Sequence, residues 1–270
     1  MSAGAAQRQL WDLSGRRAYH DELVVEAPLS LRLQGRAHVV MMRTPGDDLE
    51  LVTGYLWSSG VIDSLEDIKR LAPCPKAPES RLDVWLEAGV SGRSQSHATL
   101  LTSSCGVCSL SELGSLLDRP LRVAPMRLSA LRLSRQLKAL DEGMSLFKQT
   151  GGCHGAALLD PSGELRALFE DIGRHNAVDK ALGWALRAQE GLTPRAEGPE
   201  WGLAGWSLIV SSRAGFEIVH KAARCGVSAL MSVGASSSLA HELAQETGLS
   251  LFSFARGDRA HRHSAPLDLT

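Results

Sequence analysis

The sequence predicts a protein of mixed helices and strands in two domains, a small α+β domain over residues 19–118 and a layered α/β domain over residues 119–270. Two observations carry this prediction. The first half has short runs of alternating apolar and polar residues around one amphipathic helix, whereas the second half repeats strand, helix, strand, helix, strand at short spacing. A repeat of the second kind implies right-handed crossovers and a parallel sheet.

The small domain is predicted to contain a hairpin, a helix and a further strand, after a loose leader that ends near residue 18. Thr44-Pro45-Gly46-Asp47 is typical of a helix start, because Thr44 can cap the helix and proline suits its first turn. The predicted elements are a hairpin of residues 29–33 and 38–42, a helix that ends near Gly60, and a strand over residues 81–87.

The larger domain is predicted to contain four helices and five strands. Asn176 would cap its helix with Asp179 reaching back to it, and Glu217 with Lys221, four residues apart, would form an exposed pair. The predicted helices are residues 126–141, 176–191, 215–225 and 238–247, and the predicted strands are residues 155–159, 165–170, 206–210, 229–233 and 249–255.

Polar runs follow three of these strands. Since the carboxyl ends of parallel strands meet at one edge of a sheet, we expect the three runs to lie together and to form a site for phosphate or another polyanion. The runs are Ser211-Ser212-Arg213, Gly234-Ala235-Ser236-Ser237-Ser238 and Arg256-Gly257-Asp258-Arg259.

The two thiols of Cys105-Gly106-Val107-Cys108 are three positions apart. That spacing suits a metal ion, a dithiol/disulfide pair, or a thiolate that carries a covalently attached sulfur. The amphipathic segment from Ser109 to Leu117 would place the positive end of a helix near the second thiol, which favours the thiolate.

Two further runs are denser in function than ordinary turns need. Thr150-Gly151-Gly152-Cys153-His154 places a histidine beside two glycines, and Arg174-His175 opens a predicted helix. Either run can be a simple turn, but the arginine and histidine side chains could also grip an anion. Cys153 and Cys225 adjoin apolar runs and are predicted to be buried in the core, and Cys74 is predicted to have no role.

Composition excludes several classes of protein. The 29 basic and 30 acidic residues favour neither nucleic acid nor an anionic membrane as a partner, and no apolar run is long enough to cross a bilayer. Five cysteines in a chain of 270 residues argue for a reducing cytosol, hence a cytoplasmic protein. The P-loop, the Rossmann glycine motif and the zinc deaminase motif are all absent.

The chain resembles the FdhD/NarQ family of formate dehydrogenase accessory sulfurtransferases from about Pro28 to Arg259. Ser109 departs from the family, which usually has glycine there. The residues that carry the resemblance are Met41-Met42-Arg43-Thr44-Pro45, Gly60-Val61-Ile62-Asp63, Cys105-Gly106-Val107-Cys108, Thr150-Gly151-Gly152-Cys153-His154, Asp171-Ile172-Gly173-Arg174-His175-Asn176-Ala177-Val178-Asp179-Lys180, Ser211-Ser212-Arg213 and Phe254-Ala255-Arg256-Gly257-Asp258-Arg259.

The resemblance implies a cytosolic, homodimeric sulfur carrier whose second domain is similar to the cytidine deaminase fold. It would accept sulfur as a persulfide from a cysteine desulfurase, first on Cys105 with Cys108 sharing or releasing it. It would pass the sulfur to the molybdenum (or tungsten) bis-molybdopterin guanine dinucleotide cofactor of formate dehydrogenase. No permanently bound cofactor and no metal site are expected. The expected cofactor-binding residues are His154, Arg174, His175, Arg213, Phe254, Ala255, Arg256, Gly257, Asp258 and Arg259.

The sequence is also compatible with two other functions. The protein could be a cofactor chaperone without catalytic activity, with the CxxC a structural or redox pair. Alternatively, thiols of two subunits could bind zinc or an iron–sulfur cluster.

Overall fold

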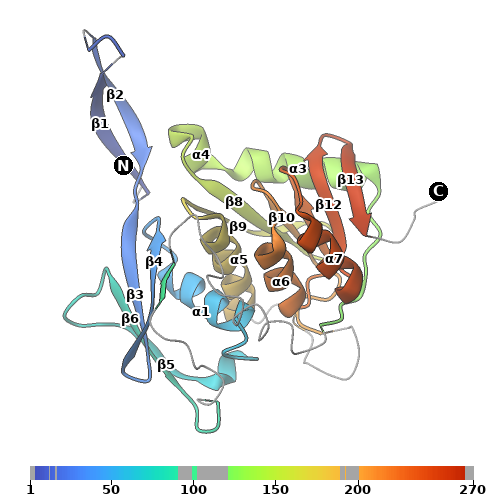
Figure 1. Ribbon diagram of the computed structural model, residues 1–270, viewed down its shortest axis with the longest axis horizontal. Coiled ribbons are helices and arrows are strands. Elements are labelled where there is room, and N and C mark those ends of the chain that lie inside the picture. The colour runs from blue at the N-terminus through green and yellow to red at the C-terminus, as the bar shows by residue number, and fades with distance from the viewer. Residues whose placement is uncertain are drawn as a thin grey trace.

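A computed structural model describes residues 4–11, 13–15, 17–90, 99–101, 121–188, 192 and 201–264 of the chain. These residues form a two-stranded, a five-stranded and a six-stranded sheet with helices packed between and against the larger two (Figure 1). The mixed α and β composition that the sequence predicts is confirmed. The resemblance to the cytidine deaminase fold stays a prediction, and the expected domain boundary at residues 118 and 119 lies outside the described residues.

The five-stranded sheet holds the predicted hairpin. The pairing of β3 with β4 is antiparallel and turns at Gln34 and Gly35, both at positive φ. β6 is parallel to β3 and antiparallel to β5, and β7 is parallel to β4. The order is β5-β6-β3-β4-β7, with β3 Ala27–Leu33, β4 Arg36–Arg43, β5 Ile68–Pro73, β6 Arg81–Leu86 and β7 Thr99–Leu101.

The six-stranded sheet is parallel at its centre and antiparallel at both sides. Parallel pairing joins β10 to β11 and β11 to β12, as the sequence predicts. The strand β13 was not predicted and extends the sheet at its edge. The order is β13-β12-β11-β10-β8-β9, with β8 His154–Leu159, β9 Leu165–Asp171, β10 Ser207–Val210, β11 Ala229–Ser232, β12 Ser250–Arg256 and β13 Arg259–Ser264.

The helices lie within a few residues of their predicted bounds, apart from the short α4, which was not predicted. The described helices are α1 Asp48–Ser58, a 3-10 turn Leu65–Asp67, α3 Ala130–Gly143, α4 Ser145–Thr150, α5 Arg174–Ala188, α6 Phe216–Arg224 and α7 Ser238–Thr247. None of the helices in the described part of the chain is long and apolar enough to cross a membrane.

Alternating side chains of the six-stranded sheet pack into two separate hydrophobic cores, one on each face. Ala157, Ile209 and Met231 face α3, whereas Ala156 and Leu208 face the layer of α5, α6 and α7. This is the pattern of a sheet that is covered on both faces, and it explains the continuous apolar runs of its central strands.

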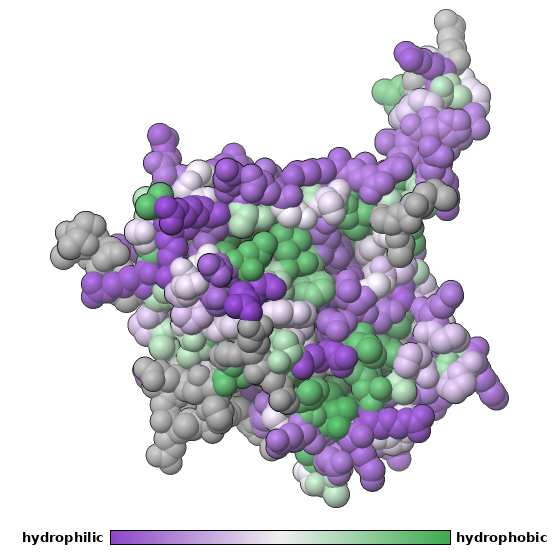
Figure 2. Space-filling model, turned by 180° about the vertical axis from the view of Figure 1, so that it is seen from behind, coloured by the Kyte–Doolittle hydropathy of each residue, from purple (hydrophilic) through white to green (hydrophobic). Residues whose placement is uncertain are grey.

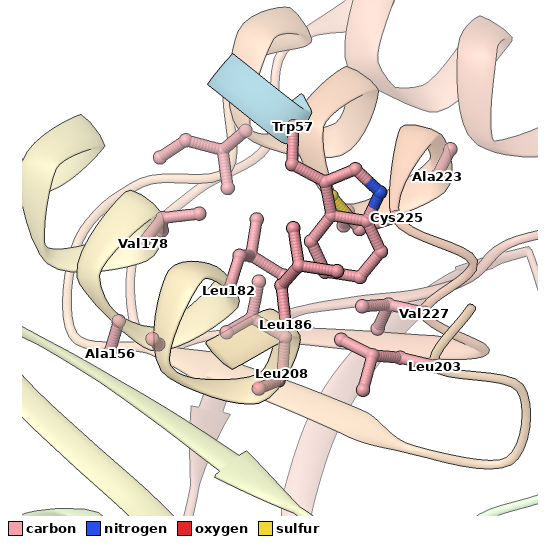
Figure 3. Close-up of a cluster of buried hydrophobic side chains, with 14 of the residues drawn as sticks. Trp57, Ala156, Val178, Leu182, Leu186, Leu203, Leu208, Ala223, Cys225 and Val227 are labelled. Atoms are coloured by element: carbon pink, nitrogen blue, oxygen red, sulfur yellow. The ribbon is translucent and has the colours of Figure 1, made fainter. Parts of the chain in front are cut away.

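One helix of the small part of the chain is built into the larger core. Trp57 of α1 is 2% exposed and lies among Leu182, Leu186 and Cys225 (Figure 3). The same core reaches Leu29 and Leu82 of the five-stranded sheet, so the two parts share one hydrophobic core.

The first residues do not form the loose leader that was expected. β1 Ala5–Trp11 and β2 Ala18–Val24 pair as an antiparallel hairpin that projects from the body and is largely hydrophilic (Figures 1 and 2). Its root packs on α4 and on Gly152. The sequence prediction was wrong here because polar residues alternate only weakly with apolar ones along an arm that has almost no core to face.

Candidate functional site

The three predicted polar runs lie at one edge of the six-stranded sheet. The strands β10, β11 and β12 run parallel, so the chain leaves all three at the same edge. β8 is antiparallel to β10 and β9 is antiparallel to β8, so the start of β8 at His154 and the end of β9 at Asp171 lie at this edge too. We call it the carboxyl edge.

Three helices also begin at the carboxyl edge: α5 at Arg174, α6 at Phe216 and α7 at Ser238. The first turn of each helix presents backbone N–H groups that have no partner within the helix, and the helix dipole adds partial positive charge. The edge therefore combines helix starts with arginine side chains, which is the chemistry that binds phosphate groups.

The turn between β12 and β13 presents the arginines. Arg256 is the register partner of Arg259, and both side chains are exposed, that of Arg259 by 92%. Oδ1 of Asp258 lies 3.9 Å from Nε of Arg259. Because both side chains are exposed to solvent, this contact neutralises the arginine only weakly. Phe254 precedes the turn at positive φ, 45% exposed, with its ring against His261.

A cavity of about 650 Å³ opens beside this turn on the face of the sheet that α3 covers. Of the ten expected cofactor-binding residues, His154, Ala255 and Gly257 line it. Gly151, Gly152 and Cys153 of the run before β8, which the sequence analysis singled out, line it as well. The sequence did not indicate the second wall, which α3, α4 and the residue between them supply: Ser134, Leu137, Lys138, Leu140, Asp141, Met144 and Phe147.

His154 lies half-buried between the cavity and the start of α5. Burial lowers the pKa of His154, and the positive charge of Arg174 and the neighbouring His175 lower it further, against an opposing effect of Asp171. The imidazole of His154 is therefore neutral at neutral pH and can accept a proton or a hydrogen bond.

The side chain of His175 contacts that of Glu217. Its Nε2 atom lies 2.8 Å from Oε2 of Glu217, and the two side chains are 15% and 23% exposed. The predicted exposed pair of Glu217 and Lys221 is therefore wrong. Glu217 fixes the ring of His175 between the first turns of α5 and α6 instead.

Lys221 belongs to a buried network between the helices. Its Nζ atom lies 2.8 Å from both carboxylate oxygens of Asp179 and 2.9 Å from Oγ of Ser58, which itself donates to Asp179. The predicted role of Asp179 at the cap of α5 is therefore wrong, since its carboxylate joins α1, α5 and α6.

Asp171 and Asn176 likewise hold the two parts of the chain together. Asp171 accepts a hydrogen bond from the backbone N–H of Thr44, and the Nδ2 group of Asn176 donates to the carbonyl of Met42 at 2.7 Å. Neither Asn176 nor Thr44 caps a helix as predicted, because α5 begins two residues before Asn176 and the N-cap of α1 is Asp47.

The thiol of Cys153 is buried, as predicted, and contacts an acid. Its Sγ atom lies 3.4 Å from Oε1 of Glu170. Burial raises the pKa of Cys153 to about 12, and the negative charge of Glu170 contributes to that increase. Cys153 is thus held as an unreactive thiol at the base of the cavity.

Cys105 and Cys108 lie outside the described residues, so their place relative to the cavity stays a prediction. Within the described part of the chain, no group of three or more histidine, cysteine or acidic side chains is arranged to hold a metal ion.

Known proteins similar to this chain agree with one another. The model of the FdhD/NarQ family matches residues 24–268. A protein named sulfur carrier protein FdhD from Nocardia farcinica is 40% identical over 260 residues, which cover 93% of this chain and 89% of that protein. A protein of the same name from Mycobacterium tuberculosis is 37% identical over 275 residues, 96% of each.

A solved structure has the same fold. It is a crystal structure from Desulfotalea psychrophila described as a formate dehydrogenase accessory protein, with a TM-score of 0.74 and 24% identity, covering 97% of this chain and 96% of that one. The match of the family model to most of the chain and the identity to the two relatives establish the relationship. The chain belongs to the FdhD/NarQ family.

Proposed function

We propose that the protein is a sulfurtransferase that carries sulfur for a formate dehydrogenase. It accepts sulfur as a persulfide on Cys105 from a cysteine desulfurase. It then passes the sulfur to the molybdenum or tungsten bis-molybdopterin guanine dinucleotide cofactor before the catalytic subunit receives that cofactor. The names of the relatives support the sulfur-carrier role. The cytoplasmic location that the composition favours and the homodimer that the family resemblance implies are part of the proposal.

The observation that carries the proposal is the carboxyl edge. The cavity there is lined by His154, whose imidazole is neutral, and by Gly257 of the turn that carries the exposed Arg256 and Arg259, and three helices begin at the same edge. Arg213, Arg256 and Arg259 would bind the phosphates of the guanine nucleotide, while His154, Arg174 and His175 would line the place of transfer. The cofactor enters as the substrate of the transfer.

The sulfur chemistry balances with two thiols. The Cys105 thiolate attacks the outer sulfur of the desulfurase persulfide; one S–S bond forms, the donor S–S bond breaks, and the donor cysteine leaves as a thiolate. Attack of the Cys108 thiolate on the Cys105 sulfur of the resulting Cys105 persulfide then forms a Cys105–Cys108 disulfide, and the outer sulfur leaves as hydrosulfide. A dithiol reductant must return the pair to the reduced state.

The test is the intact mass of the protein, without reductant, after incubation with a cysteine desulfurase and cysteine, followed by peptide mapping. One added sulfur on the peptide of Cys105 is expected in the wild type and in Cys153→Ser, and none in Cys105→Ala. A wild-type protein that stays unmodified but binds a guanine nucleotide would be a cofactor chaperone. Stoichiometric metal in freshly purified protein would instead support a metal site at the CxxC.

A further inference from the structure

The arm, which is the hairpin of β1 and β2, extends away from the body of the described chain beyond its root (Figure 1). Its two seven-residue strands pair along their whole length. A two-stranded hairpin without a covering layer is only marginally stable in water, because its side chains have nothing to pack against on either face. The arm is therefore a surface that a partner would stabilise.

The register of the arm divides its side chains between two faces. Residues that stand directly opposite each other in an antiparallel pair point to the same face, and the next pair along the strands points to the other. Leucine and tyrosine side chains are thereby collected on one face, which we call the outer face. The outer face carries three register pairs: Ala6 with Leu23, Arg8 with Asp21, and Leu10 with Tyr19.

The outer face is turned away from the body. Val24 belongs to the other face, and its Cγ1 atom lies 2.8 Å from where a Cβ on Gly152 would be, so the other face is the one that packs on the body at the root. Leu23 of the outer face keeps 40% of its surface exposed, and Tyr19, farther along the arm, keeps 44%. Apolar side chains that gather on a face without a core of its own mark an interaction surface.

The order of residues on the outer face is complementary to itself. Arg8 and Asp21 stand side by side, with an apolar pair before them and another after them. A two-fold axis parallel to the strands would place β1 of one copy over β2 of another. Arg8 then lies opposite Asp21 of the partner subunit, and Leu10 lies opposite Tyr19 of the partner subunit. One symmetry operation thus matches both the charges and the apolar groups, as an isologous dimer requires.

We infer that the outer face of the arm docks on the same face of a second copy of this chain, around a two-fold axis that runs along the arms. The inference rests on one part of the proposed function, the homodimer, and assigns its interface. It involves no cysteine and no residue that lines the cavity at the carboxyl edge. Because two hairpin faces bury little surface, the dimer dissociates on dilution.

Sedimentation of the full chain over a range of concentrations tests the interface, at low ionic strength where surface charges are least screened. Arg8→Asp leaves two acidic side chains on the outer face, and Asp21→Arg leaves two basic ones. Each variant alone should dimerise at least about tenfold more weakly than the wild type, because like charges meet across the axis. An equimolar mixture of the two variants should dimerise again, because an acidic face then meets a basic one.

Gln9→Asp is the matched control. Gln9 is exposed and is the register partner of His20 on the other face, so this change should leave the dimer as it is in the wild type. The mixture is the decisive sample, because two arms that had merely lost their structure would not recover on mixing.

The outcomes separate the interface from the homodimer itself. Wild-type dimerisation of both charge variants would overturn the interface and leave the homodimer standing. Weak dimerisation that mixing does not restore would overturn the matching of Arg8 with Asp21 of the partner subunit. A wild-type protein that is monomeric at every concentration would overturn the homodimer and the interface together, whereas sulfur loading, measured by mass, would be unaffected.

Discussion

The Nζ atom of Lys180 lies 2.9 Å from Oδ2 of Asp171, and the two side chains are 1% and 0% exposed. Both belong to the run from Asp171 to Lys180 that carries the family resemblance. The same ammonium donates to the carbonyl of Thr44 at 3.1 Å, and the Thr44 hydroxyl accepts from the backbone N–H of Ile172. This part of the motif therefore fastens the two parts of the chain to each other and does not face the cavity.

Removing one charge of this pair should destabilise the fold strongly. Asp171→Asn leaves the ammonium of Lys180 buried without a counter-charge, which typically costs about 3–5 kcal/mol. Urea unfolding at pH 7.5, followed by tryptophan fluorescence, measures the loss.

The exposed pair of Lys138 and Glu142, 3.5 Å apart, is the control, and Glu142→Gln should change stability by no more than about 0.5 kcal/mol. The double variant Asp171→Asn with Lys180→Met should recover part of the loss, because it removes both charges. Equal stability of Asp171→Asn and Glu142→Gln would refute the assigned role of the pair.

The contact between α1 and α5 depends on two glycines. A Cβ atom on Gly54 would lie 1.8 Å from the carbonyl oxygen of Asp179, and one on Gly183 would lie 1.9 Å from that of Glu50. Alanine at either site must push the helices apart, with an expected loss of about 1–3 kcal/mol or more in the free energy of unfolding.

Gly215→Ala is the comparison for both, since a Cβ there meets no atom within 4 Å and the residue has φ of −82°. Thermal unfolding should show a clear loss for the alanines at Gly54 and Gly183 and a much smaller one for Gly215. Loss of similar size in all three would contradict the packing explanation.

The elements that the sequence predicts well are those with a core to face. Leu29, Leu31 and Leu82 alternate because one face of their sheet is buried, and the polar runs after β10 and β12 could be placed at one edge because parallel topology dictates it. The arm of β1 and β2 lacks such a face and gave no comparable pattern.

The residues that sequence reasoning misplaced depend on contacts between distant segments. Glu217 and Lys221 are four residues apart and suggest a pair on one helix, yet their partners His175 and Asp179 come from α5. Phe147 is a similar case, because its six-residue helix is too short for a periodic pattern and its place in the cavity wall follows only from the fold.

Stability should fall as the pH is lowered from 7.5 to 5. Burial lowers the pKa of His38, His154 and His263 below the value of 6.5 that they have in the unfolded chain. The unfolded chain therefore binds more protons in this range, so that the loss of stability begins near pH 6.5 and is complete below the lowered pKa values.

Urea unfolding across this pH range is the measurement, and His154→Gln should make the slope shallower. His20→Gln changes an exposed side chain on the arm and should leave the slope as it is. If the wild-type protein instead becomes more stable toward pH 5, these histidines do not control the pH dependence of its stability.

Thiol reactivity should separate the cysteines of the chain by their environment. Cys153 has a pKa raised to about 12, so at pH 8 it is held as the unreactive thiol. Burial raises the pKa of Cys225 as well. Brief treatment of the native protein with iodoacetamide at pH 8 should therefore label neither, while Cys105 and Cys108 react if they are the carrier pair.

Peptide mapping by mass spectrometry gives the extent of labelling at each site. Labelling of the protein unfolded in about 8 M urea confirms that every cysteine peptide is detected. Labelling of native Cys153 as fast as Cys105 would contradict the structural role of its contact with Glu170. It would also make Cys153 a competing sulfur acceptor, because the thiolate is the nucleophile in both reactions and the thiol that alkylates first is the one that can attack a persulfide.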